Sequence, residues 1–496
     1  MGDVSEEEVD ADDLDVVDCD LMETTGADEE PQSDPDEGEE IEFFTPPRDD
    51  AVSVFGEHNE SVFCVAFDPT GAFLVSGGQD HVAIVRNVDS KQTVFTTEGH
   101  QDSVTHVTFS PDGYYLATGD MAGGVRVWLR PSNATNQWLM VMSETVGDLL
   151  WLRWWQPFPA SQAGSEKSVT HPRMVVLAAG DEDGLVAAWS VTARNSSNSK
   201  SAPVNAKYFP GAGFAATSGT FYLPSINTDR PKLVVLYSDT TLKLWDIKTE
   251  EVLTSIRLMS IARSTAGAED EDNENASVSV FCMAQPHLGT ELVHQQSDLV
   301  VVGGLNCLLM AVLKADKQTA SFSSKCLPPV LLENCGSVET VDFSWTHPLF
   351  AFGTVSGTIG IFNTVPVRLR QKWIYTASID EGQESAGITG LQWSRNAPVL
   401  FTSTSDGAVL AWPGLCGSAE LVGPAAAATG PSPLQIWWGH KAMIMDLALS
   451  PTNIVAKSDQ QQQTRHKEFM IEKYIATASD DTTVRIYTTE NLTLTC

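Results

Sequence analysis

Basic residues are scarce in this chain of 496 residues. It contains 30 Lys and Arg against 65 Asp and Glu, which gives a formal net charge of −35. Because like charges repel, this balance argues against nucleic acid or an anionic membrane surface as the direct ligand. The composition favours a basic partner instead.

Paired cysteines and long apolar runs are also missing. The eight cysteines include no CxxC pair, and the two nearest, Cys326 and Cys335, are nine residues apart, so neither a zinc site nor a disulfide framework is suggested. No apolar run approaches the roughly 18 residues of a membrane span. The N-terminus is acidic where a signal peptide would be basic and then apolar. We expect an intracellular monomer of the cytoplasm, with the nucleus as a further location, that holds no metal or cofactor.

Catalytic signatures are absent from the sequence as well. It contains no P-loop, HExxH or GxSxG motif. The string Gly211-Ala-Gly-Phe-Ala-Ala216 resembles a dinucleotide-binding turn, but it lacks the strand-then-helix context that such a turn requires. With no nucleophile and base in a recognisable pattern, the sequence predicts a protein that is not an enzyme.

Acidic residues are concentrated at the N-terminus. Residues 1–50 carry 22 Asp and Glu against the single base Arg48, a net charge of −21, and the remainder of the chain has a net charge of −14. Such a segment has too little apolar surface to offset the entropy that folding costs. We predict a disordered acidic tail over 1–50 and a folded body over 51–496.

A repeated sequence pattern extends through the folded body. Each copy has an apolar strand, a strand of small residues, a turn with Asp and Gly, and an apolar strand that ends on an aromatic residue. The second copy is the clearest and runs from Gly99-His100 to Gly124-Val-Arg-Val-Trp128. Eight copies start near Glu57, Gly99, Gly147, Gly211, Val278, Ser337, Ile388 and Gly439. The fourth and fifth copies are the weakest.

The repeat predicts a β-propeller. Each copy holds three strands, and a fourth falls in the link to the next copy, as at Gln92-Thr-Val-Phe95. One such blade cannot bury both of its faces, so eight blades must stack around an axis and share a core. Little chain remains after Tyr487, so we expect Val52 to Phe55 to complete the last blade. The predicted fold is therefore all-β, a single eight-bladed propeller preceded by the acidic tail.

One set of polar residues recurs in positions typical of structural roles. His58, His100 and His440 precede the first strand of their copies, where a buried imidazole can bind the acid of the turn. We expect a second group, of four acids, to bind the backbone amides of the turns and the network of these histidines. Its members share one position in the repeat, five or six residues before the closing aromatic. These acids are Asp183, Asp239, Asp406 and Asp481.

Other acids are placed where they could contact a partner. In a propeller, the loop before the innermost strand and the turn between the second and third strands open on the same face. The acids expected in the loops are Glu60, Asp102 and Asp148, and those expected near the turns are Asp80, Asp120, Asp181, Glu182 and Asp480. Converging carboxylates would create a negative field suited to a peptide rich in Arg and Lys, although a solvated rim is the alternative.

The repeats resemble the WD-repeat family over nearly all of residues 51–496. A closer resemblance rests on three strings that begin at Ala117, Gly147 and Gly439. With the acidic leader, they resemble the angio-associated migratory cell protein family and its fungal counterparts, which are dedicated chaperones of a large-subunit ribosomal protein (L-ten, or universal L-sixteen). In that family the acidic binding face would map here onto Asp120 and Asp148.

The resemblance implies a function that composition alone does not give. A propeller of this kind would capture the basic N-terminal segment of the nascent ribosomal protein and shield it during assembly of the large subunit. The alternatives are a signalling or cell-migration scaffold and a substrate adaptor of a ubiquitin ligase. No docking element for such an adaptor is identifiable in the sequence.

Overall fold

A computed structural model provides the three-dimensional structure of the chain. It describes residues 45–131, 137–155, 174–192, 204–211, 213–222, 231–258, 279–287, 298–315, 321–332, 334–375, 386–415, 432–455, 457–458 and 470–494. The chain divides into two units, Met1–Glu42 and Phe43–Cys496. The tail predicted over 1–50 lies almost entirely outside the described residues.

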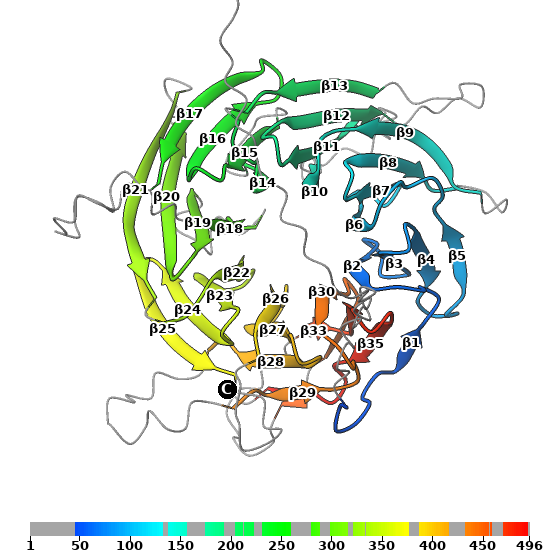
Figure 1. Cartoon of the computed structure of the whole chain (residues 1–496). Coiled ribbons are helices and arrows are strands. Elements are labelled where there is room, and N and C mark those ends of the chain that lie inside the picture. The colour runs from blue at the N-terminus through cyan, green and yellow to red at the C-terminus, as the bar shows by residue number, and fades with distance from the viewer. Residues whose placement is uncertain are drawn as a thin grey trace, which may run out of the picture. The chain divides into compact units, whose positions relative to one another are not determined.

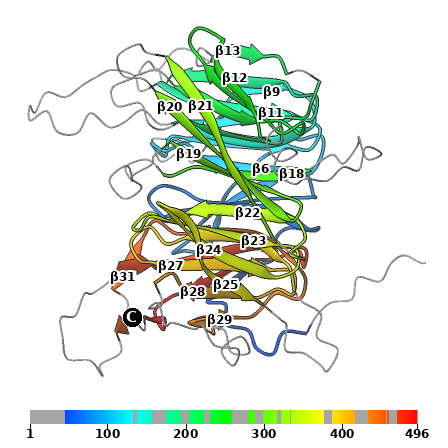
Figure 2. The same cartoon turned by 90° about the vertical axis from the view of Figure 1, so that its left-hand side faces the viewer.

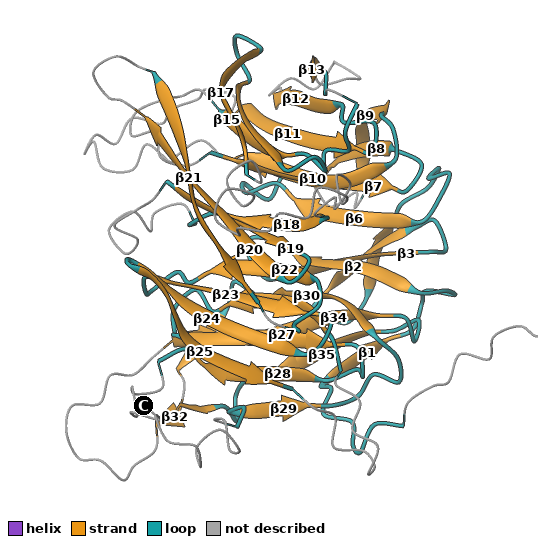
Figure 3. Ribbon diagram, turned by 60° about the vertical axis from the view of Figure 1, so that its left-hand side comes forward, coloured by secondary structure: helices purple, strands orange, loops and turns teal. Residues whose placement is uncertain are grey.

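The described part of the unit Phe43–Cys496 contains strands and loops and no helix (Figure 3). Eight four-stranded antiparallel sheets are arranged radially around one axis, with the first strand of each sheet innermost (Figure 1). Figure 2 shows the same ring from its outer wall, where the long fourth strands face the viewer. The predicted all-β fold with eight blades is therefore confirmed, including the blades of the two weakest sequence copies.

The first four blades are formed by strands that follow one another in order along the chain. Blade one contains β2 (Val62–Phe67), β3 (Phe73–Gly78), β4 (Ala83–Asn87) and β5 (Thr93–Thr96). Blade two contains β6 (Val104–Phe109), β7 (Tyr115–Asp120), β8 (Gly124–Leu129) and β9 (Leu139–Thr145). Blade three contains β10 (Leu149–Trp155), β11 (Met174–Asp181), β12 (Val186–Thr192) and β13 (Val204–Phe209). Blade four contains β14 (Ser218–Phe221), β15 (Lys232–Leu236), β16 (Thr241–Asp246) and β17 (Glu251–Arg257).

The remaining blades complete the ring. Blade five contains β18 (Val280–Ala284), β19 (Leu299–Gly304), β20 (Cys307–Ala315) and β21 (Phe322–Leu331). Blade six contains β22 (Val338–Phe343), β23 (Leu349–Thr354), β24 (Thr358–Thr364) and β25 (Val367–Ile374). Blade seven contains β26 (Ile388–Trp393), β27 (Val399–Thr404), β28 (Val409–Pro413) and β29 (Gln435–Trp437). Blade eight contains β30 (Ile444–Leu449), β34 (Tyr474–Ser479), β35 (Val484–Thr488) and β1 (Ser53–Phe55).

Four short strands lie outside the blades, close to the eighth. They are β31 (Asn453–Val455), β32 (Lys457–Ser458), β33 (Met470–Glu472) and β36 (Thr493–Leu494). They form two pairs, β31 with β33 and β32 with β36.

Apolar packing between neighbouring blades holds the ring together. The buried hydrophobic residues form eight clusters, and each cluster joins two adjacent blades, including the eighth with the first. Every residue of the second strands β7, β19, β23 and β27 is buried, because each sheet packs against a neighbour on both faces. The apolar second and third strands of the repeat are thereby explained.

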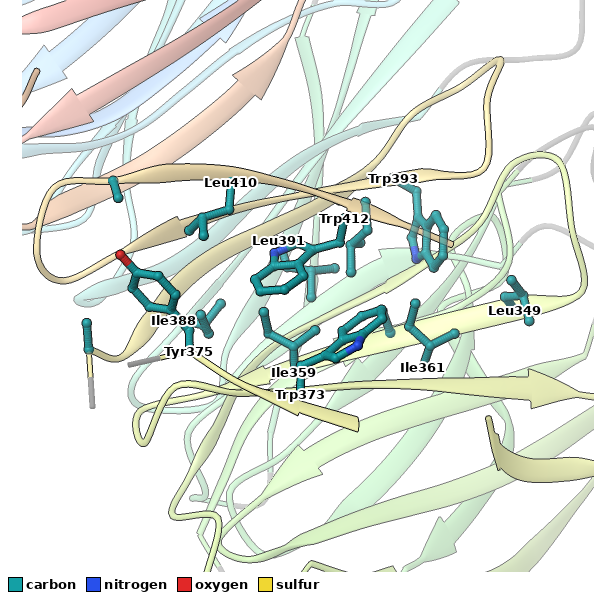
Figure 4. Packing of buried hydrophobic residues seen from close by; sticks show 14 of the residues in the cluster. Leu349, Ile359, Ile361, Trp373, Tyr375, Ile388, Leu391, Trp393, Leu410 and Trp412 are labelled. Carbon is teal, nitrogen blue, oxygen red and sulfur yellow. The ribbon is translucent and has the colours of Figure 1, made fainter. Parts of the chain in front are cut away.

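The contact between blades six and seven illustrates this packing (Figure 4). Trp373 of β25 stacks on Trp412 of β28, with ring centroids 5.2 Å apart. Ile359 and Ile361 of β24 and Leu410 of β28 lie in the same cluster. Stacked aromatic pairs stabilise a core beyond the area they bury, by about 0.5–1.5 kcal/mol.

Polar side chains connect the innermost strands of neighbouring blades around the axis. Asp342 of β22 accepts a hydrogen bond from the backbone N–H of Trp393 in β26, at 2.9 Å. Asp446 of β30 accepts one from the backbone N–H of Val65 in β2, also at 2.9 Å. Burial raises the pKa of Asp446 to about 6, although the bonds that Asp446 accepts from the Val65 and Leu447 N–H groups act to lower it. These carboxylates join strands that no backbone ladder joins.

The N-terminal strand completes the eighth sheet. β1 pairs antiparallel with β35, and Ser53 lies opposite Ile486 and Phe55 opposite Val484. Upstream of the strand, the Asp50 N–H donates to the Trp438 carbonyl at 2.8 Å. The outer edge of β35 is therefore covered by residues that precede it by more than 400 positions.

Removing the aromatic ring of Phe55 tests this closure. Phe55 is buried in the cluster that joins blades eight and one, so Phe55→Ala should lower the free energy of unfolding by about 3–5 kcal/mol. The matched control Val54→Ala lies in the same strand but faces solvent and should cost less than about 1 kcal/mol. Urea unfolding monitored by tryptophan fluorescence measures the free energy of unfolding of both variants. Equal losses of stability in the two variants would show that β1 does not contribute to the core between blades eight and one.

Candidate functional site

Two kinds of loop meet on one face of the ring. The Gln79 N–H, in the turn between β3 and β4, donates to the Ser61 carbonyl before β2 at 2.8 Å. Blade three repeats the contact, since the Glu182 N–H donates to the Asp148 carbonyl at 3.0 Å. The loops before the innermost strands and the turns between second and third strands therefore open together, as expected. We call this face the mouth face.

A chain of buried hydrogen bonds anchors the mouth-face loop of blade two. The two ring nitrogens of His100 lie 2.8 Å from Asp120 Oδ2 and 2.8 Å from Thr118 Oγ1. Trp128 Nε1–H donates to the same Thr118 oxygen at 3.0 Å. The loop before β6 is thus connected through the side chains of His100 and Thr118 to Trp128, the aromatic residue that closes the repeat.

Blades one and eight repeat the contacts of the histidine with an acid and a hydroxyl. His58 bonds Asp80 at 2.9 Å and Ser76 at 2.8 Å, and His440 bonds Asp481 and Thr477. Burial lowers the pKa of His440, although Asp481 acts to raise it. Burial acts to raise the pKa of Asp481, but the bonds from His440 and its neighbours outweigh it and hold that pKa below its usual value.

The structure corrects the assignment of three acids that were expected to contact a partner. Asp120 is 0% exposed and also accepts a bond from the Gly124 N–H at 2.6 Å. Asp181 is buried and accepts bonds from the Gly147 and Leu185 N–H groups at 2.9 and 2.7 Å. The carboxylate of Asp80 is directed to His58. These three acids hold the loops of blades one to three from inside and offer no free carboxylate to a partner.

A complementary correction applies to Asp183. It was expected in the structural set, but its side chain is exposed, and Asp181 makes the bonds to the turn in its place. The acid that reaches the loop can occupy either of two positions, two residues apart along the turn. Blades one and eight use the later position, at Asp80 and Asp481, and blades two and three use the earlier one, at Asp120 and Asp181.

The other two acids of the predicted structural set are half-buried in blades four and seven. Asp239 accepts a bond from Thr241 Oγ1 at 2.7 Å and forms an ion pair with Arg257. Asp406 accepts a bond from the Tyr375 hydroxyl at 3.1 Å. Burial, and then the charge of Asp406, raise the pKa of Tyr375.

Of the acids predicted from the sequence, six lie at the surface of the mouth face without the side-chain contacts described for the others. Glu60, Asp148, Glu182 and Asp183 are exposed, and Asp102 and Asp480 are half-buried. Asp480 accepts a hydrogen bond from the Ser61 hydroxyl, which connects blade eight to blade one. Within the described part of the chain, none of the six forms an ion pair. We call these residues, which follow the ring from blade eight through blades one, two and three, the acidic arc.

A β-bulge recurs at the mouth end of the innermost strands and was not predicted. In every blade except the fourth, the register against the second strand shifts after the first paired residue. Bulges of this kind re-aim a side chain. The skipped residues are Phe63, Thr105, Leu150, Phe281, Glu339, Thr389 and Met445. Leu150 and Phe281 are exposed although their strands are innermost, and the other five skipped residues are half-buried.

Among the residues that the structure describes, no three His, Cys, Asp or Glu side chains are grouped so that they could hold a metal ion. In the same residues, no helix is long and apolar enough to cross a membrane. Exposed side chains of the mouth face include the carboxylates of the acidic arc, the apolar Leu150 and the basic Lys441.

Comparisons with known proteins agree with this architecture. Residues 50–87, 91–128 and 431–488 match the family model described as "WD domain, G-beta repeat". The chain is 29% identical to the human Angio-associated migratory cell protein over 410 residues, which cover 81% of this chain and 76% of the relative. It is 24% identical to the Ribosome assembly protein SQT1 of Saccharomyces cerevisiae over 362 residues, 71% of this chain and 74% of the relative.

A solved structure shows the same fold with a ligand. The crystal structure of Chaetomium thermophilum Sqt1 bound to the N-terminus of the ribosomal protein L10 matches with a TM-score of 0.62 at 19% identity. The match covers 89% of this chain and all of the Sqt1 chain.

The corrected role of Asp120 can be tested by amide substitution. Asp120→Asn removes a charge that accepts several hydrogen bonds inside the protein, so it should lower the free energy of unfolding by about 3 kcal/mol. Asp148→Asn removes the same charge from the exposed loop of the next blade and should change stability by no more than about 0.5 kcal/mol. Denaturant unfolding compares the two, and an Asp120 variant as stable as the Asp148 variant would contradict the structural role.

The buried histidines predict how stability depends on pH. The folded pKa values of His100 and His440 lie below their ordinary value because burial penalises the imidazolium. The unfolded chain therefore takes up protons first, and stability should decline as pH falls below about 6.5. Unfolding curves at several pH values measure the decline. In the variant His440→Gln, which cannot titrate there, the decline should be shallower, and an unchanged curve would contradict the prediction.

Proposed function

We propose that this eight-bladed β-propeller, three stretches of which match the WD domain model, captures the basic N-terminal segment of ribosomal protein L10 during assembly of the large ribosomal subunit. It would act by binding and release, with no catalytic step. Its place of action would be the cytoplasm, with the nucleus as a further location.

The acidic arc is the observation that carries this proposal. Its six carboxylates have no cation partner among the described residues, so a guest with Arg and Lys side chains would supply the missing charges. Hydrogen bonds between guanidinium and carboxylate are about twice as strong as neutral ones and can be bidentate. The net charge of −35 would also steer a cationic segment towards the protein from a distance.

The relatives support the same proposed function. One of them is named a ribosome assembly protein, and a structural neighbour is bound to the N-terminus of L10. The name of the human relative does not describe a partner. A signalling scaffold or a ubiquitin-ligase adaptor is the alternative function, and no specific observation favours either of them.

The structure also suggests how capture would depend on the fold. Exposed Asp148 and Glu182 lie in adjoining loops of blade three, which the backbone bond between them holds together. The buried carboxylate of Asp181 fixes the same loops from inside. The contact acids would therefore be pre-positioned, which reduces the entropy that binding costs.

Charge reversal on the acidic arc tests the proposal. The variant Asp148→Lys/Glu182→Lys should bind a fluorescent peptide of the L10 N-terminal segment at least about ten-fold more weakly, because two attractions become repulsions. Fluorescence anisotropy measures the affinity, and wild-type binding should weaken as salt is added.

The matched control is Asp89→Lys/Glu251→Lys. It makes the same change in net charge at exposed positions away from the mouth face, and it should lose little affinity. If the wild-type protein does not bind the L10 segment, or if both variants bind equally, the proposal is wrong.

A further inference from the structure

A hollow lies at the mouth face, beside the end of the acidic arc in blade eight. Its volume is about 320 Å³. Three consecutive blades line it, the sixth, seventh and eighth, through the mouth ends of β22, β26 and β30 and the turns beside them. The lining is mainly apolar.

Apolar side chains form the exposed edge and the floor of this hollow. Val355, in the turn after β23, is 49% exposed, and Met443, just before β30, is 38% exposed. Ile388 and Ile444 are buried and form the floor. Met445 is one of the side chains that the recurring bulge re-aims.

One carboxylate lines the hollow, and a second belongs to a residue bonded to its lining. Glu339, which the bulge of β22 re-aims, is part of the lining. Asp480, the end of the acidic arc in blade eight, donates its backbone N–H to the Met443 carbonyl at 3.0 Å. An apolar hollow is therefore continuous with an acidic surface.

We propose that the hollow binds one bulky aliphatic or aromatic side chain of the same basic segment that the acidic arc captures, an inference that rests on the proposed function. The occupant is an extended peptide in which an apolar residue is flanked by Arg or Lys. The flanking cations meet Glu339 and Asp480 while the apolar side chain enters between Val355 and Met443.

Size and chemistry both favour this occupant. Pockets for small molecules span roughly 300–1,000 Å³, so this hollow is at the lower limit and suits a side chain. Charge attraction is long-ranged and does not fix the register of a peptide that contains several cations. An apolar side chain in a matching hollow fixes the register and excludes peptides that are merely basic.

Adding an acid to the hollow separates this anchor from simple charge attraction. Val355→Asp increases the negative charge of the mouth, so attraction alone predicts equal or tighter binding of the L10 N-terminal peptide. If an apolar side chain binds there, the variant should bind about ten-fold more weakly, which is the effect of losing the burial of one such side chain. The matched control Leu369→Asp adds the same charge at an exposed position of the outer strand β25 and should bind as the wild type does.

A neutral variant and a pair of designed peptides complete the experiment. Thr389→Leu fills the hollow without a change in charge and should weaken the L10 peptide to a similar extent. Two synthetic peptides of Arg, Gly and Ser, identical except that one carries a central Leu, should differ in affinity for the wild type but not for the Thr389 variant. Thermal unfolding confirms that each variant is folded.

The outcomes distinguish this inference from the proposed function. If the wild type binds the L10 peptide but Val355→Asp and Leu369→Asp bind it equally, the hollow has no anchor role and the inference is overturned. Equal binding of the two designed peptides by the wild type overturns it as well. Failure of the wild type to bind the L10 peptide overturns the proposed function itself.

Discussion

A sheet that is apolar on both faces cannot remain exposed to water, and this constraint determines the whole structure. Each blade buries its faces against two neighbours, and the eight apolar clusters correspond to the eight contacts between blades. The ring must close for the last contact to form, and β1 closes it by pairing with β35. Blades with weak sequence repeats, the fourth and fifth, still form complete sheets because their neighbours require a partner surface.

The positions of the mouth-face loops follow from this packing. Within each of several blades a buried acid, such as Asp120 or Asp181, connects the loop to the sheet. Neighbouring acids that are not needed for this task, such as Asp148 and Glu182, are left at the surface. The same residue type therefore has two roles a few residues apart, one that stabilises the loop and one that is available to a cationic guest. The acidic arc follows the mouth face along blades eight, one, two and three. The mainly apolar hollow lies beside its blade-eight end and is lined by blades six, seven and eight.

Much of this was predictable from sequence. The spacing from His100 to Trp128 predicted the strands of a blade, and the shortage of chain after Tyr487 predicted that an N-terminal strand would be needed. Exposure of Glu60, Asp148 and Glu182 also agrees with their predicted loop positions. The division between buried and exposed acids was less accessible. Two turn positions both direct a carboxylate towards the loop, and counting back from the closing aromatic residue does not distinguish them.

The sequence by itself determined the number of blades, the all-β fold and the sign of the charge, because strand periodicity, repeats and composition are local properties of the chain. Only the tertiary structure decided which carboxylates are buried, where the β-bulges occur, and where the hollow lies. Glu339, Thr389 and Met443 meet although each belongs to a different blade. Their proximity depends on how whole sheets pack around the axis, and no pattern within a single repeat encodes it.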